Sequence, residues 1–133
     1  MKEHLVYTAG LIDGEGTIAL LRGRSSDKFR HPVVSVTNTS RELIDFLHQT
    51  FGGVVVTQKT YKLHHKPSWS WKITYDHAIE FIQQIRPFMK ESSKCKRCDM
   101  ILSTYKSLTH RNGKYTTEQI QAKLDFETTF LSS

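Results

Sequence analysis

The sequence Thr8-Ala9-Gly10-Leu11-Ile12-Asp13-Gly14-Glu15-Gly16 decides the fold, and it directly follows an apolar run at residues 5–7. A helix over residues 5–13 presents one face with small side chains, because residues three and four apart are neighbours on a helix. That face consists of Val6, Ala9, Gly10 and Asp13. Glycine is unfavourable inside a helix, so Gly10 indicates that a second helix approaches closely on this face.

A carboxylate stands at the predicted C-terminal end of this helix. Gly14 and Gly16 are expected to end the helix, which leaves Glu15 at its tip. A negative charge is unfavourable beside the negative end of the helix dipole, and a bound cation reverses that penalty. The stretch therefore predicts a closely paired helix whose acidic tip binds a metal ion.

The nine residues resemble the signature motif of the LAGLIDADG homing endonucleases. The positions identical to that motif are Ala9, Gly10, Leu11, Ile12, Asp13 and Gly16. Thr8 replaces the first leucine, Gly14 replaces an alanine, and Glu15 replaces the second aspartate with another acid. The resemblance implies an α+β fold with an αββαββα core, in which a four-stranded antiparallel saddle-shaped sheet carries helices on one face, and with extra C-terminal helices.

Length and composition indicate one folded domain. The chain has 133 residues, of which 38% are apolar and 24% charged, and this length can bury a core without disulfides. No apolar run approaches the roughly 20 residues of a membrane span, and no signal-peptide pattern follows the charged start. We therefore expect a single domain over residues 1–133. We also expect an intracellular protein, in the cytoplasm or in an organelle stroma or matrix, without a membrane or small-molecule cofactor as partner.

The charge balance favours a polyanionic partner. Lysine and arginine exceed aspartate and glutamate by 19 to 13, which gives a net charge of +6. Such a balance favours nucleic acid or an anionic surface, and the alternative is a basic protein without such a partner. Residues 54–75 contain no acidic residue at all, and this bias favours nucleic acid.

The remaining pattern predicts two strand–strand–helix units followed by further helices. Strands are expected at residues 17–24, 31–38, 54–63 and 68–75, and helices at 41–50, 76–86, 94–108 and after 116. The predicted N-caps are Ser40, Asp76 and the pair Ser92-Ser93, and Thr116 with Gln119 forms a capping box. In the fourth strand, Trp69, Trp71, Ile73 and Tyr75 alternate with Ser68, Ser70, Lys72 and Thr74. One face of the sheet is therefore expected on the core and the other open.

The open face and its adjoining loops form the predicted DNA-binding surface. Lysine and arginine neutralise phosphates, and neighbouring polar groups read base edges. The predicted DNA-binding residues are Arg24, Lys28, Arg30, His31, Ser35, Thr57, Lys59, Tyr61, Lys66, Ser70, Lys72 and Thr74. A solvated sheet face without a ligand is the alternative interpretation.

The resemblance also implies the residues of a cleavage site. In the family, the second acid of the motif binds a divalent cation, which assigns Glu15 and the carbonyl of Gly14 to Mg²⁺, with Mn²⁺ as an alternative. Asn38 matches a polar residue that orients water, although it also reads simply as the last residue of its strand. A lysine follows a Pro-Phe pair in the family. Lys94 aligns best with it, and Lys90 and Lys96 stay open as alternatives. An exposed turn acid and an ordinary surface lysine are the competing interpretations of Glu15 and Lys94.

Two cysteines, Cys95 and Cys98, form a lone C-x-x-C. A second pair that would complete a zinc site is missing from the sequence. We interpret the two thiols as buried side chains on one face of a helix.

A single copy of the motif predicts a homodimer. Single-motif members of the family pair through the first helix, because two acidic tips are needed for two DNA strands, and this implies an interface of Val6, Ala9, Gly10 and Asp13. The expected function is a homing endonuclease that cuts both strands of a long pseudo-palindromic duplex. The alternatives are a DNA-binding protein or intron maturase of the same fold without cleavage, or a basic α+β protein with an accidental match.

Overall fold

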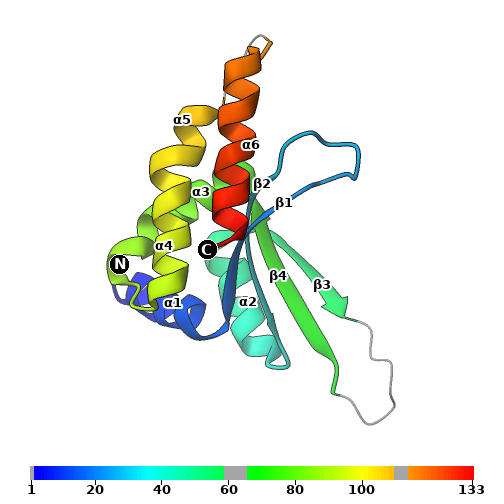
Figure 1. Cartoon of the computed structure of the whole chain (residues 1–133). Helices are drawn as coiled ribbons and strands as arrows, with labels where there is room; N and C mark the ends of the chain where they lie inside the picture. The colour runs from blue at the N-terminus through cyan, green and yellow to red at the C-terminus, as the bar shows by residue number, and fades with distance from the viewer. Residues whose placement is uncertain (1, 59–65, 110–113) are drawn as a thin grey trace.

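The computed structural model describes residues 2–58, 66–109 and 114–133, and it confirms the predicted α+β fold (Figure 1). A four-stranded antiparallel sheet has the order β1-β2-β4-β3. Its strands are β1 (Gly16–Leu21), β2 (His31–Asn38), β3 (Val54–Gln58) and β4 (Ser68–Thr74). The helices are α1 (Lys2–Glu15), α2 (Arg41–Phe51), α3 (Tyr75–Ile85), the 3-10 turn η1 (Arg86–Phe88), α4 (Ser92–Met100), the π-helical turn η2 (Ile101–Tyr105), α5 (Lys106–Leu108) and α6 (Thr117–Leu131).

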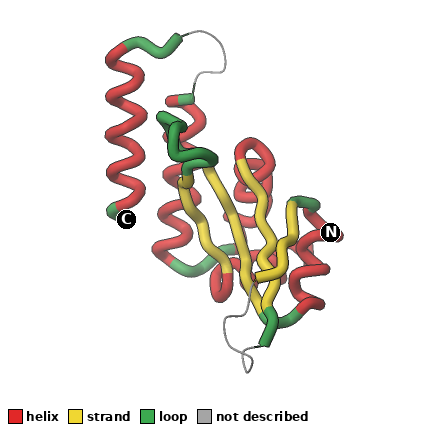
Figure 2. Tube along the Cα trace, turned by 90° about the vertical axis from the view of Figure 1, so that its right-hand side faces the viewer, coloured by secondary structure: helices red, strands yellow, loops and turns green. Residues whose placement is uncertain are grey.

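Helices cover one face of the sheet and leave the other open. The core row Ile18, Val34 and Ile73 runs across three strands, and each of these side chains is buried. Figure 2 looks onto the opposite face, where the strands lie in front of the helices and α6 stands beside the sheet. We call this uncovered side the open face. None of the described helices has the length and apolar character of a membrane-spanning segment.

Several predicted element boundaries are confirmed. Strand β2 has the predicted bounds, and Ser40 caps α2 by accepting a hydrogen bond from the backbone N–H of Leu43. The capping box of Thr116 and Gln119 starts α6. Cys95 and Cys98 are buried on α4, as expected, and burial raises the pKa of the Cys98 thiol to about 12.

Other boundaries differ from the prediction. Helix α1 runs on through Gly14 to Glu15, so that Gly14 lies inside the helix, and β1 ends at Leu21 rather than at residue 24. The predicted helix over residues 94–108 is divided by the π-helical turn. The structure describes β3 as far as Gln58, so the rest of the predicted third strand lies outside the described residues.

Two predicted N-caps are wrong. Helix α3 has Thr74 rather than Asp76 at its N-cap position. Helix α4 has Glu91 as its N-cap, one residue before the predicted serines, and the Glu91 carboxylate accepts hydrogen bonds from the backbone N–H groups of Ser93 and Lys94. A carboxylate at this position satisfies unpaired amides and complements the helix dipole.

Candidate functional site

The C-terminal end of α1 is fixed against the chain segment that precedes α4. The carboxylate of Asp13 accepts hydrogen bonds from the backbone N–H groups of Lys90, at 2.8 Å, and Glu91, at 3.1 Å. These bonds join residues that are more than 70 positions apart in sequence. Asp13 therefore has an architectural role within the chain, and the prediction that it also contributes to a dimer interface stays a prediction.

Lys94 adds a positive charge to the same helix end. Its ammonium nitrogen donates to the carbonyl oxygens of Ile12, at 3.1 Å, and Asp13, at 2.8 Å. Helix-terminal carbonyls lack intrahelical partners and carry the negative end of the dipole, so a lysine there is favourable. Of the three lysines that the sequence left open, the structure places Lys94 at the α1 tip.

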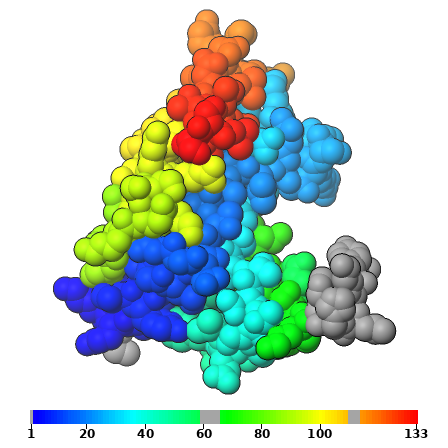
Figure 3. All heavy atoms as spheres, turned by 60° about the horizontal axis from the view of Figure 1, so that its bottom comes forward, coloured from blue at the N-terminus to red at the C-terminus, as the bar shows by residue number. Residues whose placement is uncertain are grey.

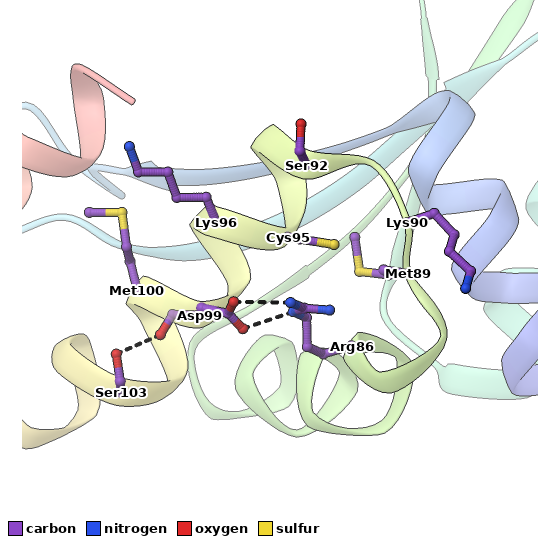
Figure 4. Close-up of a pocket in the computed structure, with 9 residues that line it drawn as sticks. All are labelled: Arg86, Met89, Lys90, Ser92, Cys95, Lys96, Asp99, Met100 and Ser103. Carbon is purple, nitrogen blue, oxygen red and sulfur yellow. Dashed lines mark hydrogen bonds and ion pairs between the residues drawn. The ribbon is translucent and has the colours of Figure 1, made fainter.

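Lys90 and Lys96 line a different surface feature, a hollow of about 580 Å³ between η1 and α4. Figure 4 shows the two lysines well apart, with Cys95 and Met89 between them and the pair of Arg86 and Asp99 to one side. The guanidinium of Arg86 donates to both carboxylate oxygens, at 2.8 and 3.0 Å, and it holds the pKa of Asp99 below its usual range. This hollow is formed without Glu15 or Asp13, so we place the chemistry at the α1 tip instead.

Glu15 is the exposed carboxylate at that tip. It is the last residue of α1 and makes no hydrogen bond or ion pair with any described residue. The preceding Gly14 is also exposed, and its carbonyl belongs to the helix-terminal set that lacks intrahelical partners. Carboxylate and carbonyl oxygens are the ligands that Mg²⁺ prefers, and Mg²⁺ keeps several waters when few protein ligands are present. The donor set therefore fits a hard divalent cation.

The described residues of the chain hold no cluster of three or more histidine, cysteine, aspartate or glutamate side chains that could bind a metal ion. A single tip thus offers one free carboxylate plus carbonyl oxygens. A cation at Glu15 requires further oxygen ligands from water, from a phosphate or from a second tip.

Asn38 lies at the same end of the sheet as the α1 tip. Gly16, the first residue after α1, pairs with Val36, and Asn38 follows two residues later in β2. Its side-chain oxygen accepts a hydrogen bond from the backbone N–H of Ser40 at 2.8 Å. This bond fixes the side chain at the entry to α2, and the amide nitrogen makes no hydrogen bond to another described residue.

Arg97 is a cation beside this site that the sequence reasoning missed. With Lys94 and Thr17 it lines a small hollow of about 190 Å³ at the free edge of β1. Its guanidinium donates to the carbonyl of Ile18 at 2.8 Å and stacks on the ring of Phe130. The available signal was the spacing, since Lys94 and Arg97 are three residues apart and share one helix face.

Most of the described members of the predicted DNA-binding set lie on the open face or in exposed loops. Ser35 and Lys72 are cross-strand partners on the open face, and Thr37 and Ser70 form a hydrogen-bonded pair beside them. Thr74 pairs with Val33 on the same face. The remaining exposed members of the set, in the loops, are Arg24, Lys28 and Lys66. Lys59 and Tyr61 lie outside the described residues.

Two members of the predicted DNA-binding set differ in their placement from the expected open-face or loop position. Thr57 is exposed, but it pairs with Trp69, whose neighbour Ser70 lies on the open face, so the side chain of Thr57 points to the opposite side of the sheet. The open-face positions of β3 are instead Val54 and Val56, which are 59% and 50% exposed. Arg30 is used inside the protein: it donates to the carbonyl of Leu20, and its guanidinium lies 3.9 Å from the buried carboxylate of Glu127 on α6.

The exposed side of α1 also differs from the predicted dimer face. Ala9 has no exposed surface, because it packs into the core of its own protomer, so its assignment to the interface is corrected. Val6 and Tyr7 are about half exposed, and a Cβ atom built on Gly10 meets nothing within 4 Å. Figure 3 shows the dark blue residues of α1 on the surface next to the cyan of α2. Gly16, by contrast, is required inside the protomer, since a Cβ there would lie 2.9 Å from Ile12.

Comparisons by sequence identify no related protein: no family sequence model matches the chain, and no characterised protein matches it. Comparisons by structure identify proteins with a similar fold. The crystal structure of the homing endonuclease I-CvuI bound to its target in calcium aligns with 96% of this chain and 96% of its own, with a TM-score of 0.61 and 13% identity.

Two further DNA complexes have the same fold. The group I intron-encoded homing endonuclease I-CeuI aligns with 98% of this chain and 67% of its own, at a TM-score of 0.63 and 17% identity. The LAGLIDADG homing endonuclease I-GzeII aligns with 92% of this chain and 43% of its own, at a TM-score of 0.68 and 14% identity. The chain therefore has the fold of the LAGLIDADG homing endonucleases, as the motif at residues 8–16 predicted.

Proposed function

We propose that this protein is a homodimeric, divalent-metal-dependent endonuclease of the homing type, which cuts both strands of a long pseudo-palindromic DNA duplex near its centre. One observation carries the proposal: Glu15 is an exposed carboxylate without a described partner at a helix end that Asp13 and Lys94 hold in place. Structural neighbours with the same fold are homing endonucleases solved in complex with DNA.

The open face supports binding of a duplex. Lys72 and the serine and threonine side chains around it combine one positive charge with several hydrogen-bonding groups. The net charge of +6 supports the same partner. Phosphate contacts of lysine and arginine supply affinity, and polar contacts in the grooves supply sequence preference.

Glu15 and the carbonyl oxygen of Gly14 are the ligands we assign to the cation. When bound there, a divalent metal supplies Lewis-acid stabilisation of the phosphate and lowers the pKa of a coordinated water. Magnesium is the metal we propose, and crystal structures of DNA complexes of the neighbour I-CvuI were determined in the presence of calcium and of magnesium, the latter with uncleaved DNA. Oxygen atoms of water and of DNA phosphates complete the metal coordination shell, to which one protomer contributes too few ligands.

Lys94 acts on the phosphate in this proposal. Two of its three N–H groups point to carbonyl oxygens of α1, and the third, which has no partner among the described residues, can donate to an oxygen of the scissile phosphate. A fixed cation beside the developing negative charge stabilises the transition state of phosphodiester hydrolysis. The free amide nitrogen of Asn38 would orient the attacking water, while its oxygen is held by Ser40.

Dimerisation supplies the second cleavage site. Each protomer has one acidic tip, and a two-fold axis between two α1 helices brings two tips together over the two DNA strands. Val6, Tyr7 and Gly10 form the exposed part of α1 that we assign to this contact. A two-fold protein symmetry then requires a pseudo-palindromic target.

Selection from a randomised duplex library tests the proposal. We expect the native chain in Mg²⁺ to enrich pseudo-palindromic cut sites, and Glu15→Gln to enrich none. Glu118→Gln, which changes an exposed glutamate on α6, is the matched control and is expected to cut like the native chain. Sequence-specific binding without cutting in Mg²⁺ by any of the three proteins would favour the alternatives, a DNA-binding protein or an intron maturase without cleavage.

A further inference from the structure

Tyr75 and His31 form a stacked aromatic pair at one end of the open face. Their ring centroids are 4.0 Å apart and their planes differ by 9°. His31 is the first residue of β2. It lies two and four residues before Val33 and Ser35, so the three side chains share the open face. The ring of Tyr75, stacked on it, lies on the same side of the sheet.

The backbone of Tyr75 explains how the ring reaches this side. The sequence predicted that residue 75 would point toward the core, because it continues the period-two alternation of Trp71 and Ile73. Instead, β4 ends at Thr74 and Tyr75 takes a positive φ of 55° at the start of α3. Among the described residues Tyr75 is the one non-glycine residue with a positive φ. This conformation is unfavourable for a bulky side chain, and such strain concentrates at functional sites.

The pair presents a neutral aromatic surface to solvent. Tyr75 is 55% exposed, whereas His31 beneath it is 8% exposed. Gly23 of the β1–β2 loop covers one edge, since a Cβ atom built there would lie 3.5 Å from Cε1 of His31 and 3.7 Å from the hydroxyl of Tyr75. Burial lowers the pKa of His31 and so favours the neutral imidazole, although the negative charge of Asp27 opposes this shift.

The surroundings identify what this surface can bind. Lys72 lies on the same face and supplies a positive charge for a phosphate. The aromatic pair supplies no such charge. An exposed ring with no charge is suited to an apolar group, and the apolar group that a DNA duplex presents in its major groove is the thymine methyl. The projecting β1–β2 loop, which starts and ends beside the pair, borders the same part of the face (Figure 1).

We propose that Tyr75, supported from below by His31, is a specificity-determining residue that packs its ring against a thymine methyl group of the target duplex. This inference rests on the proposed DNA-binding function. In a homodimer the contact occurs twice, so it fixes one symmetric pair of positions in the two half-sites. Its role is base preference, and it takes no part in the cleavage reaction.

Tyr75→Gly removes the ring and suits the backbone, because glycine adopts a positive φ without penalty. Tyr75→Asn is the second variant, since asparagine also tolerates this conformation. Tyr75→Phe keeps the ring and removes only the hydroxyl. Leu131→Ala is the control, because it shortens a half-exposed apolar side chain on α6, away from the open face. Thermal melting verifies that each variant is folded.

The measurement is the dissociation constant for the selected duplex and for duplexes in which single thymines are replaced by deoxyuridine, which lacks the methyl group. We expect Tyr75→Gly and Tyr75→Asn to bind about tenfold or more weakly, with an unchanged salt slope, since no phosphate contact is lost. Tyr75→Phe and Leu131→Ala are expected to bind like the native chain. One symmetric pair of deoxyuridine substitutions should weaken the native chain but should not weaken Tyr75→Gly further.

Three results would overturn the inference. The first is a folded Tyr75→Gly protein with native affinity and base preference, and the second is a salt slope that falls by about one, which indicates a phosphate contact. The third is a native chain for which no deoxyuridine substitution changes affinity, and this arm needs no variant to fold. If the native chain selects no duplex at all, the proposed function itself fails, and this inference fails with it.

Discussion

The ammonium nitrogen of Lys94 lies 2.8 Å from the backbone carbonyl oxygen of Asp13, at the C-terminal end of α1. The Asp13 carboxylate in turn accepts backbone hydrogen bonds from Lys90 and Glu91, which precede α4. The two contacts run in opposite directions between the same two segments and fix the position of the α1 tip. Glu15, two residues further, is thereby presented by a rigid support although its own side chain is exposed.

Lys94→Met should reduce both stability and cleavage. The change removes two charge-assisted hydrogen bonds and a favourable helix-dipole interaction, which we expect to lower the free energy of unfolding by about 1–2 kcal/mol. Cleavage at saturating DNA should fall about a hundredfold or more, because the phosphate loses a fixed cation. Lys96→Met, on the rim of the separate hollow, is the matched control and should change neither quantity. Equal cleavage by the two variants would contradict the role of Lys94.

Asp13→Ala should mainly affect folding. Two backbone N–H groups lose their acceptor, so we expect the free energy of unfolding to fall by about 1–3 kcal/mol. Chemical denaturation with urea measures the loss. A variant as stable as the native chain would show that these two hydrogen bonds do not hold the tip.

Arg30 and Lys72 should respond differently to salt. Arg30 is bonded to Leu20 and Glu127 inside the protein, whereas Lys72 is exposed on the open face. Removing a phosphate contact lowers the slope of log K against log salt concentration by about one per charge. We therefore expect Lys72→Ala to reduce the slope and Arg30→Ala to leave it unchanged. A reduced slope for Arg30→Ala would restore Arg30 to the DNA-binding set.

The pair Arg86–Asp99 predicts an acid-dependent loss of stability. The hydrogen bond and charge of Arg86 hold the pKa of Asp99 below its usual value of about 3.9. A depressed folded-state pKa contributes stability above the unfolded-state pKa, and the contribution is lost as the pH falls through the folded-state value. The melting temperatures of Asp99→Asn and of the native protein, measured between pH 7 and pH 2, should differ most at neutral pH and become equal in acid. Curves that stay parallel down to pH 2 would refute the assignment.

Gly10→Gln should separate dimerisation from folding. Nothing in the protomer lies within 4 Å of a Cβ at this position, and glutamine favours helix more than glycine does. We expect an unchanged or raised melting temperature together with a shift from dimer to monomer in sedimentation velocity. If Gly10→Gln formed a dimer as stable as that of the native chain, the dimer interface would not include this face of α1.

Sequence patterns predicted the elements and the acidic tip well, because both depend on local residues. The alternation in β4 placed Ser70 and Lys72 correctly, and the motif placed Glu15 at the end of a helix beside Lys94. The errors arise where the chain departs from regular geometry or uses distant contacts. Tyr75 left the predicted face through a positive φ, and Arg30 was assigned to DNA because its partner Glu127 is 97 residues away.

Two further errors have a geometric origin. The sequence of β3 begins with three valines and shows no alternation, so its face was unreadable until the pairing of Thr57 with Trp69 fixed the register. On α1, the residues that share a face with Val6 divide into the buried Ala9 and the exposed Gly10. The helix spacing alone could not show which of the two lies against the protomer core.

The central claim is that Glu15 makes this fold a nuclease. The most direct test incubates one selected pseudo-palindromic duplex with native protein, Glu15→Gln and Glu118→Gln in Mg²⁺, and measures strand cleavage and binding in parallel. We expect native protein and Glu118→Gln to cut both strands, while Glu15→Gln binds but cuts at least a hundredfold more slowly. Cleavage by Glu15→Gln at the native rate would contradict the account.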